Sequence, residues 1–596
     1  MNPSDAFVDD ADDCDEDFHC NRKDVEIGVA VPLYGSSLND PGGDGPDHTP
    51  TKLRRRQMLV SGSALVAAVI ASLSFVIWIL NKTSLAISLT ETPSSQPSLA
   101  LSTTPSVNPS ASPSSNPTVS EVPYTSPSMM PSSSSMPSVH PSVAPSLSQS
   151  PSLQPPTSPT TKLEGYVPNV STLRNQIICG YQGWFAYPGD GAPINKWKHW
   201  FSHPTDASAA YLEVDMYPFM EEYDESDLKE SNLHHRDGSK VKFFSSARPN
   251  VVKKHFEWMR DYGISGVFHM RFMQDIGKPR NYEWKTRVMR NVRAAAESTG
   301  RVFAVSYNIA GGKIDDSVLD ELKRDWKNLV DNEKVTQSGR YIHHNGLPVL
   351  RIYGIGFKAS NVTDTDKIAE LIQWFRFDAD PRFRVFLVGG VPSGWRTLSL
   401  DSRENVKWRS IYQSFDAIHP WHVGRWASIN GFETYFKNTI SADAVLCAEL
   451  GILYMPTMFP GFSWHNLNRK NRIESSEAIP ITPINSIPRQ GGRFMWQQAY
   501  RYAETENITT VWMAQVDEGT AIFKVAKTEH ELPAQGAWLT LDADGEGELP
   551  RDWYLRLCGW AQRMMLRQIS LTDTIPIQPS DYCLECGDGA VANQQR

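Results

Sequence analysis

Two adjacent carboxylates near the end of the chain are the residues best placed to do chemistry. Asp517 and Glu518 follow the apolar run 509–515 and precede Gly519. Neighbouring carboxylates push each other's pKa values apart, so one can give a proton while the other takes one. Cleavage of a glycosidic bond typically uses two carboxyl groups in this way. The pair therefore predicts Glu518 as a catalytic acid/base and Asp517 as its partner, with a surface acidic turn as the plainer alternative.

Polar and aromatic residues also stand at the ends of the other apolar runs. The chain has 18 tryptophans, and the apolar face of a sugar packs well on an indole ring, although tryptophan is also ordinary core filler. Any one of these side chains can equally be satisfied in the core, so only the collection indicates a site. The residues that we expect to bind substrate are Tyr181, Trp184, His269, Arg271, Tyr307, His419, Trp421, Trp464 and Gln515.

The elements that must position these residues alternate between strand-like and helix-like patterns. The strand-like runs are 177–185, 264–272, 302–308, 347–353, 385–389, 415–421, 452–459 and 509–515. Amphipathic stretches lie between them, for example 251–262, 282–298, 317–332 and 364–375, and Gly263 is a candidate helix cap. Eight strands with intervening helices predict an α/β fold of the (β/α)8 TIM barrel type, with the active site at the carboxyl ends of the strands. A doubly wound sheet is the alternative, but Gly180-Tyr-Gln-Gly183 is not its phosphate loop.

Other ligand classes have little support. We expect the barrel domain to span 163–572, followed by a C-terminal tail at 573–596. The chain lacks the HExxH zinc motif, and adjacent histidines such as His343-His344 seldom bind one ion together, so no metal or cofactor is expected. The net charge is −9 and no basic motif is present, which argues against a nucleic-acid partner.

The run 58–80 contains no charged residue. As a helix it is long enough to cross the ~30 Å hydrocarbon core of a bilayer, and it lies too far from the N-terminus to be a cleaved signal peptide. Lys52, Arg54, Arg55 and Arg56 precede it, and the positive-inside rule then leaves the N-terminus in the cytosol. We therefore predict a single-pass type II membrane protein of the Golgi or plasma membrane, with the lipid bilayer as a partner through 58–80.

The regions on either side of this run differ sharply in composition. Residues 1–57 are rich in acidic residues and predict a disordered cytosolic tail. Residues 81–162 repeat Pro-Ser and predict a disordered, extended stalk outside the cytosol. Sequons for N-glycosylation occur only after the span, which agrees with this topology. They begin at Asn81, Asn169, Asn361 and Asn507.

The seven cysteines do not form a disulfide framework for a chain this long. Cys179, Cys447 and Cys558 lie in strand or helix patterns and are expected to be buried thiols. Cys583 and Cys586 form a lone CxxC, for which a local disulfide or two free thiols are the alternatives.

Several motifs of the expected barrel domain resemble proteins grouped as glycoside hydrolase family 71/99-like. The motifs are Gly180-Tyr-Gln-Gly-Trp-Phe, Pro188-Gly-Asp-Gly, Trp197-Lys-His-Trp, Pro460-Gly-Phe-Ser-Trp-His-Asn, Ile487-Pro-Arg and Asp517-Glu-Gly-Thr-Ala-Ile-Phe-Lys. The resemblance covers essentially the whole domain and implies a (β/α)8 barrel. Its relatives include the family 99 endo-α-mannosidases, among them a Golgi type II membrane enzyme with the same layout, and it implies retaining hydrolysis by two glutamates three residues apart, without a metal.

By this resemblance Glu518 matches the acid/base, while the base position falls on Gln515. An amide cannot take a proton, so Asp517, or a carboxylate from another loop such as Asp190 or Asp275, would have to replace it. Two hypotheses stay open. The first is a membrane-anchored glycoside hydrolase, endo-α-mannosidase-like, that acts on glycans or polysaccharides. The second is a protein that binds glycans in the same cleft without cleaving them.

Overall fold

The structure is a computed structural model that describes residues 166–311, 315–474, 482–506, 508, 510–513, 518–541 and 543–581, without the side chains at 470–474, 510–513 and 581. The predicted tail at 1–57, span at 58–80 and stalk at 81–162 lie outside this part of the chain, as do Cys583 and Cys586. Within it, no helix combines the length and the apolar character needed to cross a membrane.

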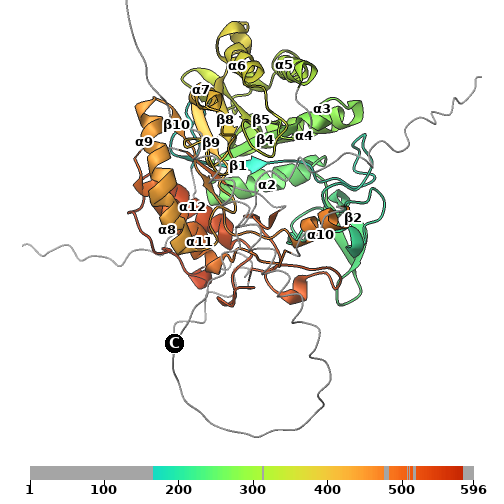
Figure 1. Cartoon of the computed structure of the whole chain (residues 1–596). Helices are drawn as coiled ribbons and strands as arrows, with labels where there is room; N and C mark the ends of the chain where they lie inside the picture. The colour runs from blue at the N-terminus through green and yellow to red at the C-terminus, as the bar shows by residue number, and fades with distance from the viewer. Residues whose placement is uncertain are drawn as a thin grey trace, which may run out of the picture. The chain divides into compact units, whose positions relative to one another are not determined.

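A curled parallel sheet forms the centre of the described part (Figure 1). Its strands pair in the order β10-β9-β8-β7-β5-β4-β1-β12-β11, and the short strand β6 (His343–His344) pairs with β7. The strands are β1 (Gln176–Tyr181), β4 (Gly266–Phe272), β5 (Val302–Asn308), β7 (Leu347–Tyr353), β8 (Phe386–Val391), β9 (Ala417–Pro420), β10 (Leu453–Tyr454), β11 (Thr457–Met458) and β12 (Thr510–Met513).

The two ends of this sheet meet in one segment of chain. β10 pairs with β9, β11 pairs with β12, and only Met455 and Pro456 separate β10 from β11. Pro456 has no backbone N–H to give to a strand ladder, so an interruption at this point is expected. The sheet therefore closes on itself through the segment 453–458, which confirms the predicted TIM-like barrel, because a doubly wound sheet would leave two free edges.

Helices cover the outside of the sheet (Figure 1). The covering helices are α2 (Pro249–Tyr262), α3 (Met273–Ile276), α4 (Pro279–Thr299), α5 (Asp316–Asp331), α6 (Thr365–Gln373), α7 (Lys407–Gln413), α8 (Ile429–Tyr435), α9 (Ser441–Glu449), α11 (Arg493–Glu504) and α12 (Trp553–Met565), while α10 (His465–Glu474) lies apart from them. Gly263 ends α2 with φ 75° in the left-handed region, as the sequence predicted, because glycine adopts this conformation without steric cost. Asp315 and Asp364 cap α5 and α6 by accepting backbone N–H groups.

One element was not predicted. Between β1 and α2 the chain leaves the barrel and forms an antiparallel hairpin of β2 (Leu228–His234) and β3 (Lys240–Phe244). The segment before the hairpin packs against α10, where Arg469 donates to the carbonyl of Ala209 at 2.7 Å. The predicted buried thiols of Cys179, Cys447 and Cys558 are confirmed, since all three are free and buried.

Candidate active site at the barrel mouth

Strand register decides which strand-end residues point into the barrel. Successive side chains of a strand point to opposite faces. Arg351 on β7 donates to Ser306 Oγ on β5 at 3.0 Å and contacts His419 Nδ1 on β9 at 3.0 Å. Tyr307, the neighbour of Ser306 on β5, faces helix α5, so Ser306 and its register partner Arg351 lie on the inner face of the sheet. Arg351 and His419 therefore point inward, and Tyr353, two residues after Arg351, does the same.

Gly390 leaves room for the contact between Arg351 and His419 because glycine has no side chain. A Cβ atom added to Gly390 on β8 would lie 2.8 Å from Tyr353 Cα and 3.0 Å from Arg351 Nη2. The guanidinium of Arg351 passes over this glycine to reach His419. Burial lowers the pKa of Arg351 to about 9, so the group keeps its positive charge at neutral pH.

His419 is held in one tautomer. Burial, with the nearby charge of Arg351 adding to it, lowers the pKa of His419 well below its usual value, so the ring is neutral. Its Nδ1 accepts from Arg351, and its Nε2 must therefore carry the proton and face Thr457 Oγ1 at 3.3 Å. Thr457 in turn donates to the carbonyl of Pro420 at 2.7 Å. The barrel floor is thus a connected polar chain.

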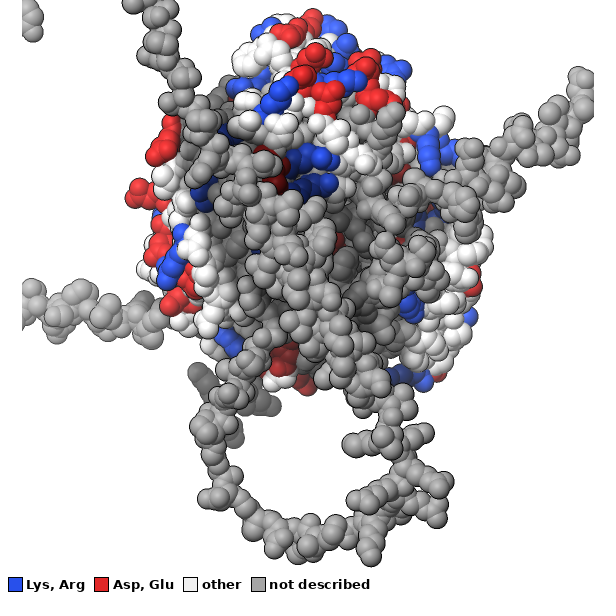
Figure 2. All heavy atoms as spheres, viewed as in Figure 1, with Lys and Arg blue, Asp and Glu red and all other residues white. Residues whose placement is uncertain are grey.

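An aromatic wall rises from this floor. The ring of Tyr353 lies 5.3 Å from that of Phe357 and 5.7 Å from that of Trp421, between centroids. Trp421 is only partly buried, so part of its indole is open to a ligand, as expected for a sugar platform. On the face seen in Figure 1, basic and acidic side chains lie together in a recess beneath the upper helices (Figure 2).

The ion pair between Arg425 and Asp401 at the mouth has a structural role. Arg425 Nη2 lies 2.7 Å from Asp401 Oδ2. Asp401 also accepts from Ser393 Oγ at 2.8 Å and from the N–H of Gly394 at 3.1 Å. Because both carboxylate oxygens have donors, Asp401 is suited to holding the loop after β8 and not to proton transfer.

The charge of Glu518 reaches Tyr353. Burial raises the pKa of Tyr353, and the charge of Glu518 adds to the shift. Glu518 is partly buried, and its carbonyl accepts the N–H of Ser463 at 2.8 Å. Gly519 follows with φ 62°, and a Cβ there would lie 2.6 Å from Ser463 Cβ. Glycine is thus required both for the turn and for this close approach.

Two buried charged residues fix the turn that carries Glu518. Arg489 donates to the carbonyl of Gly519 at 2.7 Å and to that of Ala521 at 2.8 Å. Asp215 accepts from Ser463 Oγ at 2.6 Å and from the backbone N–H of His465 at 2.7 Å. Three sequence motifs, around residues 460–466, 487–489 and 518–524, therefore meet at one point.

The role of Asp215 was not predicted from the sequence. Its partners lie far along the chain, and no local spacing connects them with the Glu213-Val-Asp215 segment. Trp464, which stands between Ser463 and His465, is partly buried and packs on Phe462 at 5.8 Å between ring centroids.

Four of the expected substrate-binding residues face the helix layer instead of the mouth. Arg271 on β4 makes two hydrogen bonds to Asp325 on α5, of 2.8 and 2.7 Å, and Tyr307 OH donates to the same carboxylate at 2.6 Å. His269 has the same strand parity as Arg271 and pairs in register with Tyr181, whose hydroxyl contacts His255 Nδ1 on α2 at 2.9 Å. The period of two along each strand is the sequence signal that separates these residues from the inward set.

Trp184 lies on the mouth side of β1. Its indole stacks on the ring of His199 at 3.7 Å and on that of Phe272 at 5.0 Å. Phe272 ends β4 with the inward parity, because it pairs with Asn308, which in turn pairs with Tyr353. Asp517 and Gln515 lie outside the described residues.

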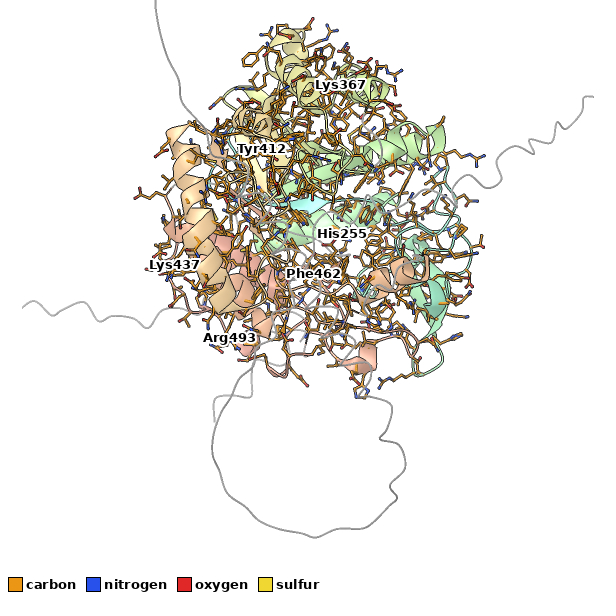
Figure 3. All side chains as sticks on the ribbon, viewed as in Figure 1. His255, Lys367, Tyr412, Lys437, Phe462 and Arg493 are labelled. Atoms are coloured by element: carbon orange, nitrogen blue, oxygen red, sulfur yellow. The ribbon has the colours of Figure 1, made fainter. Side chains whose placement is uncertain are left out.

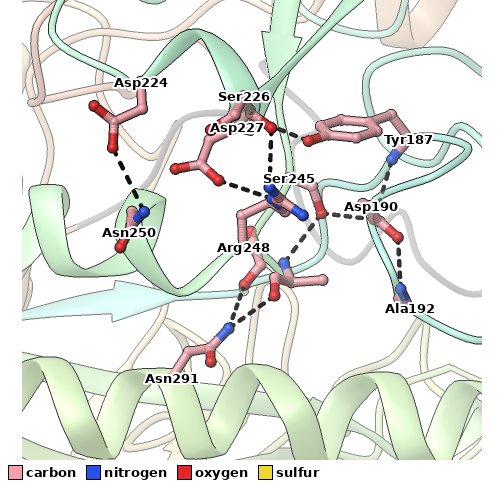
Figure 4. A network of polar contacts seen from close by, with 12 residues as sticks. Tyr187, Asp190, Ala192, Asp224, Ser226, Asp227, Ser245, Arg248, Asn250 and Asn291 are labelled. Carbon is pink, nitrogen blue, oxygen red and sulfur yellow. Dashed lines mark hydrogen bonds and ion pairs between the residues drawn. The ribbon is translucent and has the colours of Figure 1, made fainter.

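The alternative carboxylates are engaged elsewhere. Asp190 accepts from Ser245 Oγ at 2.7 Å and from the N–H of Ala192 at 2.8 Å, in the network that also joins Arg248 to Asp227 (Figure 4). Asp275 lies 3.7 Å from the amino groups of both Lys198 and Lys285. Among the described side chains, no cluster of three or more His, Cys, Asp or Glu is arranged to hold a metal ion.

Two of the predicted glycosylation sites can be located. Asn169 and Asn361 are both exposed, whereas Asn81 and Asn507 lie outside the described residues.

No protein-family model and no curated protein sequence matches the chain. Among solved structures, the chain is similar to a GH99 endo-alpha-mannosidase from Bacteroides thetaiotaomicron in complex with bis-tris-propane, with 13% identity over 67% of this chain and 99% of that chain and a TM-score of 0.45. It is also similar to a glycoside hydrolase-like protein, with 15% identity, 62% and 99% coverage and a TM-score of 0.38. A GH5_18 protein from Bifidobacterium longum subsp. infantis is 12% identical, with 53% and 73% coverage and a TM-score of 0.32. The barrel assignment itself rests on the strand pairings.

Proposed function

We propose that this protein is a membrane-anchored glycoside hydrolase, with Glu518 as its general acid/base. The observation that carries the proposal is the placement of Glu518, which is partly buried, follows strand β12 and sits in a turn fixed by Ser463 and Arg489, with its charge reaching Tyr353. Protonation of a glycosidic oxygen requires a carboxyl group at the sugar-binding site, and an aromatic ring is a surface on which a sugar packs. The substrate class is a glycan or polysaccharide, with an endo-α-mannosidase-like reaction as the specific form.

The side chains at the mouth divide the work. Trp421 and Trp184 each offer a partly buried ring on which a sugar face can pack. Tyr353 and the buried Arg351–His419 pair lie below them and hold the floor of the site in shape. Glu518 gives its proton to the leaving oxygen and then takes one from water, while Asp517 serves as the second carboxylate.

A protein that binds glycans without cleaving them is the second candidate. It is favoured by the engagement of other carboxylates: Asp401, Asp190 and Asp275 all have structural partners. If Asp517 cannot act as the base, the site has only one catalytic carboxylate, because position 515 is a glutamine. The aromatic wall would still bind sugar.

The test uses the full chain with three variants, Glu518→Gln, Asp517→Asn and, as a control, Glu548→Gln, which changes an exposed glutamate. Each is screened against α-mannosides, xylans and arabinans for released oligosaccharide and for binding. The hydrolase proposal expects release by the parent chain and by the control, and loss of release in Glu518→Gln with binding retained. Binding of a glycan by every variant, with release by none including the parent, would establish the second candidate.

The topology is also a proposal. We infer a type II arrangement in the Golgi or plasma membrane, with 58–80 in the bilayer, 1–57 in the cytosol and the barrel beyond the stalk 81–162. It is supported by the charge-free run, by the basic residues before it and by the position of every sequon after it. Resistance of the chain to carbonate extraction, lost when 58–80 is deleted, would test the anchor.

A further inference from the structure

Leu400 has a backbone conformation that is unusual for leucine. It lies in the loop that joins β8 to α7, and its φ of 54° is in the left-handed region. Residues other than glycine, asparagine and aspartate rarely adopt this conformation. Leu398 has the same φ, but its side chain is buried in the core, whereas that of Leu400 is 60% exposed. Burial therefore compensates the strain at Leu398, and no such burial compensates it at Leu400.

Hydrogen bonds hold Leu400 in this conformation. The N–H of Ser402 donates to the carbonyl of Ser399 at 2.9 Å, which closes a tight turn with Leu400 and Asp401 at its centre. The carboxylate of Asp401 is in turn held by Arg425 Nη2 at 2.7 Å. The surroundings thus impose the strained backbone, a situation that recurs at ligand-binding sites.

The turn is attached to the aromatic wall of the mouth. Ser402 forms an antiparallel bridge with Phe357, whose ring belongs to that wall. Tyr412 on α7, which lies in the upper part of the molecule in Figure 3, ties the same two loops together. Its hydroxyl contacts Ser402 Oγ at 2.9 Å and donates to the carbonyl of Gly356 at 3.1 Å. Leu400 therefore stands on a rigid rim of the mouth.

Electrostatics connect this turn with Glu518. Burial raises the pKa of Tyr353, and the charges of Glu518 and Asp401 both add to the shift. Because salt screens a charge over about 10 Å, the two carboxylates act on one hydroxyl only if both are near it. Leu400 directly precedes Asp401, so it belongs to the same side of the mouth as the proposed acid/base.

Glycine or asparagine at position 400 would serve the fold better than leucine. Both adopt the left-handed backbone readily, and neither would expose a large apolar side chain to water. The side chain that is present therefore suits a contact made outside the fold. A wholly apolar partner would bury the neighbouring ion pair of Asp401 and Arg425 at a cost, whereas a sugar ring offers an apolar face to Leu400 and hydroxyls to the charged groups.

We propose that Leu400 is a specificity-determining contact, on which a sugar unit beyond the cleaved bond packs its apolar face. The inference rests on the proposed function. It adds that the site recognises a chain of several sugar units, because a ligand confined to the neighbourhood of Glu518 does not reach the rim.

The test measures binding of α-mannobiose and α-mannohexaose to the full chain in lipid nanodiscs by isothermal titration. All proteins carry Glu518→Gln, so that bound glycan is not cleaved. We expect Leu400→Asn to raise the Kd for the hexaose about three- to tenfold, because the apolar contact is lost, and to leave the Kd for the biose unchanged. Leu400→Met, which keeps an apolar side chain, should bind both ligands as the parent does.

Leu450→Asn is the matched control. Leu450 is 43% exposed and follows α9, at the opposite end of the barrel from the mouth, so the same substitution there should change neither Kd. Leu400→Gly, which also fits the left-handed backbone, replaces Leu400→Asn if that variant does not fold.

The inference is overturned if the folded Leu400 variants bind the hexaose as the parent does. It is also overturned if their affinity falls equally for both ligands, which would indicate a disturbed loop, or if Leu450→Asn weakens binding as much. Binding of neither mannoside by the parent is a different result, because the endo-α-mannosidase-like function then fails and the inference falls with it.

Discussion

The carboxylate of Asp325 gathers two side chains that stand at strand ends. It accepts two hydrogen bonds from Arg271 and one from Tyr307, and all three groups are buried. A buried ion pair stabilises a fold little more than apolar residues in its place would. Removal of one partner, however, leaves the other charge buried without a counter-charge. At the scale of single residues, an ion pair and its hydrogen bonds thus hold strands β4 and β5 to helix α5 on the helix side of the barrel. The other face of the same strands lines the mouth.

Asp325→Asn should lower the free energy of unfolding by about 3–5 kcal/mol, because Arg271 would be left buried without its counter-charge. Chemical denaturation of the full chain measures this loss, with Asp320→Asn as a control, since Asp320 is 70% exposed on the same helix. Under conditions where the variant is still folded, glycan binding should be unchanged. A specific loss of binding without loss of stability would instead make Arg271 and Tyr307 substrate contacts.

His422 gives the fold a measurable pH dependence. It is completely buried, and burial, with the charge of Arg425 adding to it, lowers its pKa to about 3. A group whose pKa is lowered on folding stabilises the protein above its unfolded pKa of ~6.5, and this stability is lost as the pH falls toward 3. By pH 5 the loss is about 2 kcal/mol from this residue.

His422→Phe keeps the ring shape and removes the titration. We therefore expect the decline in unfolding free energy between pH 7 and pH 5 to be about 2 kcal/mol smaller in the variant than in the parent. Denaturant titrations at the two pH values check this. An equal decline in both proteins would show that His422 is protonated without penalty in the folded state.

At the scale of elements, the barrel depends on places where strands carry no side chain. Gly390 on β8 leaves the space through which Arg351 reaches His419. Gly390 therefore affects both the packing of β7, β8 and β9 and the shape of the site floor.

Gly390→Ala should cost about 1–3 kcal/mol of stability, because the added methyl group overlaps Tyr353 and crowds Arg351. Gly339→Ala is the matched control, since a Cβ there meets nothing within 4 Å. Glycan affinity should fall in the first variant and not in the second. If the Gly390→Ala protein is destabilised but binds glycan with the affinity of the parent protein, the floor of the site does not contribute to ligand binding.

The sequence predicted elements better than it predicted contacts. The runs 302–308 and 347–353 coincide with β5 and β7, because buried parallel strands are continuous apolar runs with sharp ends. The β2–β3 hairpin was missed because most residues of β2 are polar, so the segment has no apolar run. The structure places Glu518, Trp421, Trp184 and His419 toward the barrel interior or its mouth, where they stay predicted site residues. Arg271, His269 and Tyr307 face the helices, which only the parity of their strands could indicate, and the role of Asp215 required the fold itself.

At the scale of the whole molecule, the exposed sequons make the topology testable. Asn169 and Asn361 are exposed on the described domain, so both can accept a glycan if the domain is outside the cytosol. Expressed in a eukaryotic secretory system, the chain should shift in mobility on glycosidase treatment, and Asn169→Gln and Asn361→Gln should each remove one step of that shift. A chain with no glycan at either asparagine would contradict the type II arrangement.

Barrel closure also sets the order of events during synthesis. β1 has two neighbours in the sheet: β4 is made before the later strands of the barrel, but β12 is the last to be made. Until β12 emerges from the ribosome, one side of β1 presents unpaired N–H and C=O groups, which invite association with other nascent chains. β12 therefore closes the barrel last, and truncation before it should yield a chain retained by chaperones, even though every earlier strand of the sheet has been made.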